Sequence, residues 1–284
     1  MALLLAFLIG LAGLVIASPA ARAAEVDAID RSSIRLSKLN EGEAALYLWS
    51  GVRIDANWRI PDQSGKAGDT FKLPLPKELG GSVGSFELKG GEGDSLTYGT
   101  CAVEYTQVIC TLNANVENKN NVGGSLWVSS QVNTLIEVDK ITFPLSSGPL
   151  QVPLPNGQKN IGYSPHVPSD IKKSGWFTGP DKNVIRWNIV VPGAKIADRS
   201  RTVITDTYGV QGTKLTLQRD SMQIFWIPNT PKCWNELESA ECRNDLSDSS
   251  VPSSTVTVDD DKDQVKAVLD NKGQIFQADR IYVF

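Results

Sequence analysis

Four cysteines are the residues of this 284-residue chain whose spacing points most clearly to chemistry. Cys101 and Cys110 lie within one short stretch, and Cys233 and Cys242 lie within another. Zinc sites favour thiolates about two to four residues apart with further Cys or His ligands, and this chain has a single His. Other pairings of four cysteines exist, but we predict one local disulfide in each stretch. Each would stabilise the fold by roughly 2.5–3 kcal/mol on the chain-entropy estimate, and an oxidising compartment would maintain it.

An acidic run near the C-terminus is the second group of residues that could do chemistry. Asp259, Asp261 and Asp263 place carboxylates at alternate positions, and Asp270 stands at the twelfth position of the run. This spacing is similar to that of a calcium loop, but Gln264 occupies the sixth position, where the sharp turn of such a loop needs Gly. We therefore predict a solvated acidic loop and no cofactor, with calcium as the weak alternative.

Other reactive groups are sparse. His166 lies between two prolines without a Gly-x-Ser-x-Gly elbow, so we predict a surface residue and no enzyme activity. Lys140 or Lys173, with Asp206 as the proton-transferring acid, could form an intramolecular isopeptide bond to an Asn. That bond requires a buried Lys, and burial is not visible in a sequence.

Short strands must position the first cysteine pair. Residues 97–103 and 107–112 are rich in β-branched and aromatic side chains, which is typical of strands. A turn over residues 104–107 would set Cys101 opposite Cys110 across a hairpin. Further strands are expected within residues 44–53 and 135–143. No amphipathic helix longer than two turns is visible in the pattern, so we predict a β-sandwich from residue 24 to residue 160.

Prolines and glycines dominate residues 144–168, which predicts a semi-stiff linker without a central strand. A second sandwich is expected over residues 161–284, and its clearest strand is 183–192. Further strands are expected at residues 202–206, 214–217, 222–227, 253–258, 264–269 and 280–284. Because the last of these patterns runs to the final residue, we expect the closing strands to lie beyond the sequence given. The fold class is therefore all-β, with two tandem sandwiches.

The N-terminal segment and the overall charge indicate an exported protein. Residues 1–16 are apolar and are followed by Ala21-Arg22-Ala23, which predicts a secretory signal peptide of residues 1–23 that is cleaved after Ala23. The alternative is an uncleaved anchor, although a membrane span usually needs about 20 apolar residues. The formal net charge is −4 and no basic patch stands out, so we predict no nucleic-acid partner.

Four short motifs carry a resemblance to a known family. Gly68-Asp-Thr-Phe-Lys-Leu-Pro-Leu-Pro76 resembles a strand in the first ligand-binding sandwich of Gram-positive MSCRAMM-type adhesins, which bind fibrinogen or collagen. Thr111 to Glu117 resembles their Thr-Phe-Thr-Asp-Tyr-Val-Asp latch-cleft motif, with departures at Asn113, Ala114 and Asn115. Residues 184–191 and 204–207 resemble the opening strands of the second sandwich.

The resemblance implies two Ig-like sandwiches that bind an extended peptide in the cleft between them by adding a strand to an exposed edge. A C-terminal extension of the second domain then pairs beside the motif in the first. The residues implied for this ligand and latch cleft are Thr111, Leu112, Asn113, Ala114, Asn115, Val116 and Glu117. The expected partner is an extracellular protein or peptide.

The family also implies a secreted, cell-wall-associated location, and we expect a monomer. The alternative interpretation is a structural stalk or pilus-like surface protein without its own ligand. A binder should leave a strand edge unpaired, whereas a stalk should block its edges.

Overall fold

The computed structural model describes residues 23–42, 44–178, 184–209 and 215–284. The predicted signal peptide, apart from Ala23, and Lys214 lie outside the described residues. Within the described part, strands dominate, the one α-helix is the five-residue α1 (Pro231–Asn235), and no helix is long and apolar enough to cross a membrane. The all-β prediction is confirmed.

The chain divides into two compact units. Unit 1 comprises the described residues up to 44, together with 51–131 and 139–158, and unit 2 comprises residues 45–50, 132–138 and 159–284. The predicted division between residues 160 and 161 stays a prediction. The segments 45–50 and 132–138 are joined to the start of the long C-terminal part by backbone hydrogen bonds, including one of 2.9 Å from Leu48 N–H to the Gly162 carbonyl.

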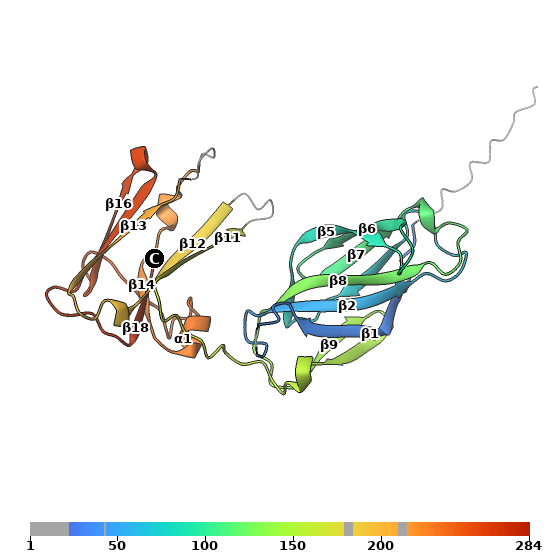
Figure 1. Ribbon diagram of the computed structural model, residues 1–284, viewed down its shortest axis with the longest axis horizontal. Helices are drawn as coiled ribbons and strands as arrows, with labels where there is room; N and C mark the ends of the chain where they lie inside the picture. The colour runs from blue at the N-terminus through green and yellow to red at the C-terminus, as the bar shows by residue number, and fades with distance from the viewer. Residues whose placement is uncertain (1–22, 43, 179–183, 210–214) are drawn as a thin grey trace, which may run out of the picture. The chain divides into compact units, whose positions relative to one another are not determined.

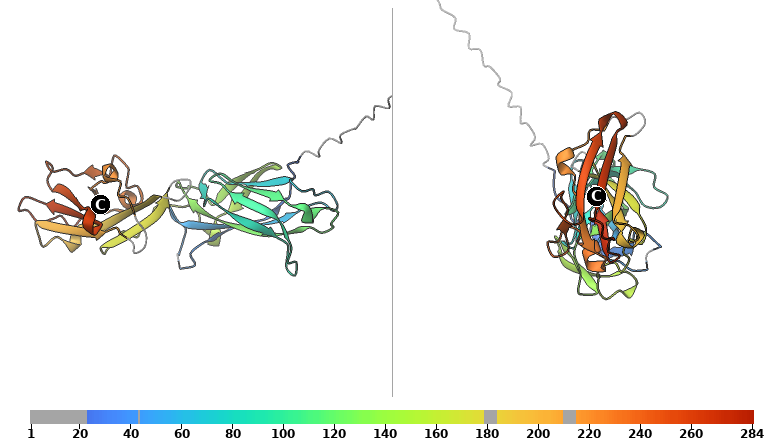
Figure 2. Two further views of the ribbon diagram at one scale, coloured as in Figure 1. Left: turned by 90° about the horizontal axis from the view of Figure 1, so that it is seen from above. Right: turned by 90° about the vertical axis from the view of Figure 1, so that its left-hand side faces the viewer.

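Two four-stranded sheets and a separate hairpin build unit 1, and their layers can be followed in Figures 1 and 2. The first sheet has the order β1 (Ile29–Lys38), β2 (Gly51–Arg59), β8 (Gly123–Val132), β4 (Leu79–Gly81). The second has the order β3 (Thr70–Pro74), β7 (Gln107–Leu112), β6 (Thr97–Val103), β5 (Gly84–Lys89). The hairpin is β9 (Lys140–Leu145) with β10 (Gly148–Pro153).

Alternation of side chains defines the core of unit 1. Along β2, Val52, Ile54, Ala56 and Trp58 are buried, while the residues between them face outward. The Trp58 ring stacks on Phe71 of β3 at a centroid distance of 5.8 Å. The two sheets therefore share one apolar layer, as in a sandwich.

The predicted hairpin around the first cysteine pair is confirmed, with strand bounds equal to those predicted. Cys101 lies directly opposite Cys110, and the two form a disulfide with a Cα–Cα distance of 3.9 Å. Two other strand predictions need correction. The pattern in residues 135–143 yields a strand only from Lys140, and the predicted linker 144–168 contains β10.

Prolines explain why β9 and β10 pair with each other alone among the described strands. Pro144 lies opposite Pro149, and Pro153 lies opposite Lys140. Hydrogen-bonded and non-hydrogen-bonded pairs alternate along an antiparallel ladder, and these two pairs are of the same kind because they are four residues apart. In a non-hydrogen-bonded pair the backbone N–H groups point away from the partner strand, so a proline there removes no hydrogen bond from the hairpin. The prolines do remove donors from its outer edges, which blocks lateral extension.

Unit 2 has a five-stranded and a three-stranded antiparallel sheet (Figure 1). The larger sheet has the order β11 (Lys172–Thr178), β12 (Val184–Pro192), β18 (Arg280–Val283), β14 (Phe225–Pro228), β15 (Asn244–Asp245). The smaller has the order β13 (Arg201–Thr207), β17 (Gln264–Asp270), β16 (Ser253–Asp259). The described part of the predicted strand 214–217 is not a strand.

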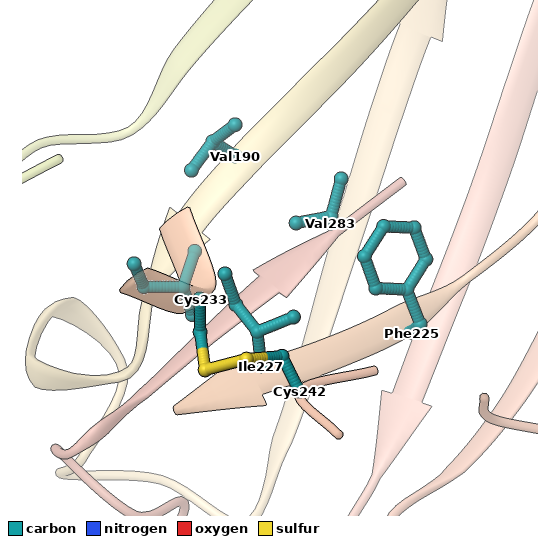
Figure 3. Close-up of a cluster of buried hydrophobic side chains, with 7 residues drawn as sticks. Val190, Phe225, Ile227, Cys233, Cys242 and Val283 are labelled. Atoms are coloured by element: carbon teal, nitrogen blue, oxygen red, sulfur yellow. A yellow bond between two sulfur atoms is a disulfide. The ribbon is translucent and has the colours of Figure 1, made fainter. Parts of the chain in front are cut away.

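The centre of the larger sheet of unit 2, formed by β18, β14 and the C-terminal end of β12, is buried on both faces. Val191 and Tyr282 face a cluster that includes Leu269 of the smaller sheet. Their neighbours Val190 and Val283 face the opposite cluster, which the Cys233–Cys242 disulfide completes (Figure 3). The loop that carries α1 and this disulfide therefore covers the outer face of the sheet. Both predicted disulfides are present.

Five short 3₁₀ helices complete the secondary structure of the described part. They are η1 (Ala114–Val116), η2 (Pro155–Gly157), η3 (Gly193–Lys195), η4 (Arg219–Ser221) and η5 (Asp260–Lys262).

Candidate functional site

The predicted cleft segment Thr111–Glu117 follows a central strand of unit 1. Its first two residues end β7, which pairs with β3 on one side and β6 on the other. Leu112 N–H donates to the Asp69 carbonyl at 2.8 Å, and the Leu112 carbonyl accepts from Gly68 N–H at 2.9 Å. Asn113 N–H donates to the Tyr98 carbonyl at 2.9 Å. These backbone groups already have partners, so a ligand at this segment would meet side chains.

The asparagines of the segment hold its turn. Asn113 caps η1, because its side-chain oxygen accepts from Asn115 N–H at 2.9 Å. The side-chain amides of both asparagines donate to the Thr97 carbonyl, at 2.9 and 2.8 Å. Glu117 accepts from Ala67 N–H at 3.0 Å, and Val116 is buried. The side chains that face solvent are therefore those of Thr111, Ala114, Asn115 and Glu117.

A free strand edge lies in unit 2, at the N-terminal half of β12. The C-terminal strand pairs with β12 only from Ile189 to Pro192, where Ile189 exchanges hydrogen bonds with Phe284 at 2.9 and 3.0 Å. No described strand pairs with the preceding residues on that side. Because alternate residues of a strand point their N–H and C=O groups to the same side, Ile185 and Trp187 present theirs along this open edge.

The same hairpin carries exposed apolar side chains. Phe177 is 64% exposed, its cross-strand neighbour Ile185 is 38% exposed, and Trp176 is 45% exposed. Phe177 pairs with Ile185 on one face, and Trp176 lies on the other. Figure 1 shows that β11 and β12 extend beyond the rest of their sheet. Sequence reasoning missed this site, because residues 172–178 lack the alternation that marks a half-buried strand.

A charged and aromatic cluster lies next to the open edge. Lys173 Nζ is 2.6 and 2.8 Å from the two carboxylate oxygens of Asp206, whose side chain is only 13% exposed. The ammonium also lies 5.5 Å from the centroid of the Trp187 ring, which stacks on Tyr208. Burial and nearby carboxylates raise the pKa of Tyr208. Lys173 therefore lies beside Asp206, but its side chain is 44% exposed, and Lys140 in unit 1 is exposed as well, so neither lysine has the burial that an isopeptide bond requires.

The four candidate calcium ligands do not lie together in the structure. Asp259 and Gln264 flank the turn between β16 and β17, whereas Asp270 ends β17 at the far end of the hairpin. At about 3.3 Å per strand residue, Asp270 is roughly 20 Å from the turn. Lys262 pairs with Asp259 at 2.6 Å, Arg219 pairs with Asp260, and the described residues contain no group of three metal-binding side chains. His166 is exposed, as predicted.

Residues 46–138 match the family described as bacterial Ig domain. The chain resembles the collagen adhesin (CNA) from S. aureus, with 15% identity over 93% of this chain and 82% of that one and a TM-score of 0.52. It has the fold of Gram-positive MSCRAMM-type adhesins.

A second solved structure supports the same fold. Serine-rich repeat protein Srr2 from Streptococcus agalactiae is 13% identical over 92% of this chain and 85% of that one, with a TM-score of 0.54. No curated protein sequence matches the chain. The predicted resemblance to Ig-like adhesins is confirmed, and at these identities it concerns the fold.

Proposed function

We propose that this protein is a non-enzymatic adhesin region of a bacterial cell surface that binds an extended segment of an extracellular protein. Support comes from the adhesin fold and from an edge that can accept a strand. The open half of β12 offers the backbone groups of Ile185 and Trp187. Main-chain hydrogen bonds would supply affinity, and exposed apolar neighbours would supply selectivity.

The fold also motivates a proposal for the ligand's position. In adhesins of this type the peptide lies between two sandwiches, and we propose the same mode here, with Thr111–Glu117 contributing its solvent-facing side chains. Collagen is the ligand named for the S. aureus adhesin, so a collagen-like extracellular protein is the first ligand to test.

A structural stalk is the second candidate function. The blocked edges of β9 and β10 and the two disulfides favour it, because these features resist pairing and unfolding. The open edge of β12 favours the adhesin, since a stalk gains nothing from unpaired donors. The two candidates therefore differ in whether this edge takes part in binding.

Surface plasmon resonance on residues 24–284, against immobilised collagen, fibrinogen and fibronectin, tests the proposal. Ile185→Pro removes one N–H from the open edge and leaves the pairing with β11 intact, while Ile185→Ala removes the side chain and keeps the N–H. We expect Pro to weaken binding at least about tenfold more than Ala. Equal effects of the two variants, or the absence of binding to all three proteins, would favour the stalk.

A matched variant tests the segment in unit 1. Thr111→Lys with Ala114→Lys changes two exposed side chains and spares the asparagines that hold the turn. If the segment contacts the ligand, this pair weakens binding while the thermal midpoint stays unchanged. Unchanged binding would remove Thr111–Glu117 from the site without affecting the proposal for β12.

A further inference from the structure

An open groove with both polar and apolar lining lies on the outer face of unit 1, at one end of the sheet that contains β1, β2 and β8. Its volume is about 580 Å³, and its lining includes Asp30, Asn57, Arg59, Glu92 and Ser125. None of these residues belongs to the cleft segment or to the open edge of β12.

A bulge in β1 borders this groove. The pairing jumps from Asp30 opposite Asn57 to Arg35 opposite Asp55, so β1 carries extra residues at this point. Asn57 N–H donates to the Ser33 hydroxyl at 2.7 Å, and that hydroxyl donates to the Asp30 carbonyl at 2.6 Å. Bulges redirect side chains and are frequent beside binding sites. Here the bulge exposes the Asp30 end of the strand to the groove.

Glycines keep the floor of the groove low. A Cβ atom on Gly123 would lie 2.7 Å from the Trp58 carbonyl oxygen, and one on Gly124 would lie 2.6 Å from the Lys89 carbonyl oxygen. Gly91 N–H donates to the Gly123 carbonyl at 3.0 Å, which fixes the neighbouring loop against β8. Main chain therefore forms the floor, and its shape is set by contacts that a side chain would break.

Both walls of the groove are held by hydrogen bonds. The Asp94 carboxylate accepts from Leu96 N–H at 2.9 Å and from the Tyr98 hydroxyl at 2.6 Å, which braces the loop that carries Glu92. On the other side, Arg59 donates to the Asn121 side chain at 3.0 Å. These bonds pre-organise the site, and a pre-organised site binds at a lower entropic cost.

An aromatic platform lies next along the same face. Trp127 is two residues from Ser125 on β8 and is 50% exposed. The Arg53 guanidinium lies 4.7 Å from the centroid of its ring and is held by three hydrogen bonds to Asp55, of 2.7 to 3.0 Å. The Asp55 carboxylate raises the pKa of Arg53, which stays charged. The indole is therefore fixed and solvent-facing.

We propose that the groove and Trp127 form a binding site for a neutral oligosaccharide. Sugar hydroxyls would pair with the side chains of Asn57, Ser125 and Asp30, and the apolar face of one sugar ring would stack on Trp127. The groove lining carries two carboxylates and one guanidinium, Asp30, Glu92 and Arg59, so it disfavours anionic ligands. The short polar side chains suit a ligand with many hydroxyls better than an apolar peptide.

Nuclear magnetic resonance titration of residues 24–284 tests this proposal with chitotetraose, maltotetraose and cellotetraose as neutral probes and a heparin tetrasaccharide as the anionic probe. We expect saturable shifts at Asn57, Ser125 and the Trp127 indole N–H with at least one neutral probe, and none with heparin. Failure of all three neutral probes at ~10 mM, or preferential binding of heparin, would overturn the proposal.

Three variants make the result specific. Trp127→Ala and Asn57→Ala should each weaken the affinity about tenfold. Ser125→Trp keeps a strand-forming residue at an exposed position, fills the groove, and should abolish binding without unfolding the unit. Trp176→Ala in unit 2 is the control, an exposed tryptophan outside the groove, and should bind like the parent. Unchanged affinity of Trp127→Ala and Ser125→Trp would overturn the assignment.

Discussion

The two disulfides close loops of equal length but stand in different surroundings. Each joins cysteines nine residues apart, so both remove a similar amount of entropy from the unfolded chain. Cys101 and Cys110 bridge two strands that backbone hydrogen bonds already pair. Cys233 and Cys242 instead hold a loop whose one helix has five residues.

The two disulfides differ in how much of the surrounding structure would remain folded without them. Without its disulfide, the hairpin of unit 1 still has the ladder between β6 and β7 and the adjoining strand β3. The loop of unit 2 covers Val190, Ile227 and Val283 (Figure 3). It is fastened otherwise by a few contacts, among them the Trp49 indole N–H donating to the Asn235 carbonyl at 2.7 Å. The two disulfides therefore close loops of equal length, but the loop of unit 2 depends on its disulfide more than the hairpin of unit 1 does.

The largest expected effect follows removal of the second disulfide by Cys233→Ala with Cys242→Ala. Opening of the loop becomes easier by about 2.5–3 kcal/mol, because the open state is no longer cross-linked. Hydrogen exchange at the Trp234 and Glu236 amides, which bond Thr230 and Lys232, should quicken about a hundredfold. Exchange within β6 and β7 is the internal control, and an unchanged rate at Trp234 would contradict the comparison.

Removal of the first disulfide, by Cys101→Ala with Cys110→Ala, should leave its hairpin formed. Urea unfolding should show a loss of roughly 2.5–3 kcal/mol for unit 1, while cross-strand nuclear Overhauser effects between positions 101 and 110 persist. The loop around α1 should keep its protection. A shifted register between β6 and β7 would show that the covalent bond, and not the ladder, specifies this hairpin.

Each unit also contains a side-chain cap whose removal should have a smaller effect. Thr230 caps α1, since its hydroxyl accepts from Cys233 N–H at 3.3 Å, and Asn113 caps η1 in unit 1. We expect Thr230→Ala and Asn113→Ala each to cost about 1 kcal/mol in urea unfolding of the unit concerned. Asn113→Asp retains the cap acceptor but loses the amide that donates to the Thr97 carbonyl, so it should recover only part of the loss. Equal stability of Asn113→Ala and the parent would show that the turn is held elsewhere.

The smallest expected effect is a pH dependence in unit 1. The Tyr98 hydroxyl lowers the pKa of Asp94 below its ordinary 3.8, and Asp94 raises the pKa of Tyr98 above its ordinary 10.0. The lowered pKa stabilises the folded state above pH 3.8, and this contribution is lost as the pH falls through the folded value. The raised pKa stabilises it below pH 10.0, and this contribution is lost as the pH rises through the folded value.

Tyr98→Phe tests this pH dependence because it removes the tyrosine hydroxyl and, with it, the largest cause of the lowered pKa of Asp94. The difference in urea midpoint between parent and variant should be constant near neutral pH and should shrink in acid below 3.8 and in alkali above 10.0. A difference that does not vary with pH would assign the effect to packing alone.

Strands with a strong local signal could be predicted from the sequence. Residues 97–103 and 107–112 carry β-branched side chains, and their turn fixes the register that aligns Cys101 with Cys110. The strand β10 escaped prediction because its prolines indicate a linker. These prolines are tolerated because, in the register that the two strands adopt, each proline nitrogen faces the outer edge of the hairpin, where no hydrogen bond is lost. The register depends on how the strands pair in the folded protein, so it cannot be predicted from the local sequence.

The candidate sites were harder to predict for the same reason. Asn113 and Asn115 were expected at a ligand cleft, but their amides bond the Thr97 carbonyl, a partner from another strand. The four candidate calcium ligands do not lie together because residues 264–270 are extended and carry Asp270 away from the turn. The groove beside Asp30 depends on a bulge and on glycine contacts between distant segments, which no local pattern encodes.

The strand order β11-β12-β18 also determines how unit 2 would bear tension. Both β11 and β18 are antiparallel to β12, so they run parallel to each other. A force applied at Lys172 and Val283 therefore pulls β11 and β18 past β12 in opposite directions. The hydrogen bonds between the strands are then loaded in shear, so they bear the force at the same time and do not break one after another. Survival under such a load depends on the unfolding rate, so this sheet is arranged to hold when it is stretched from end to end.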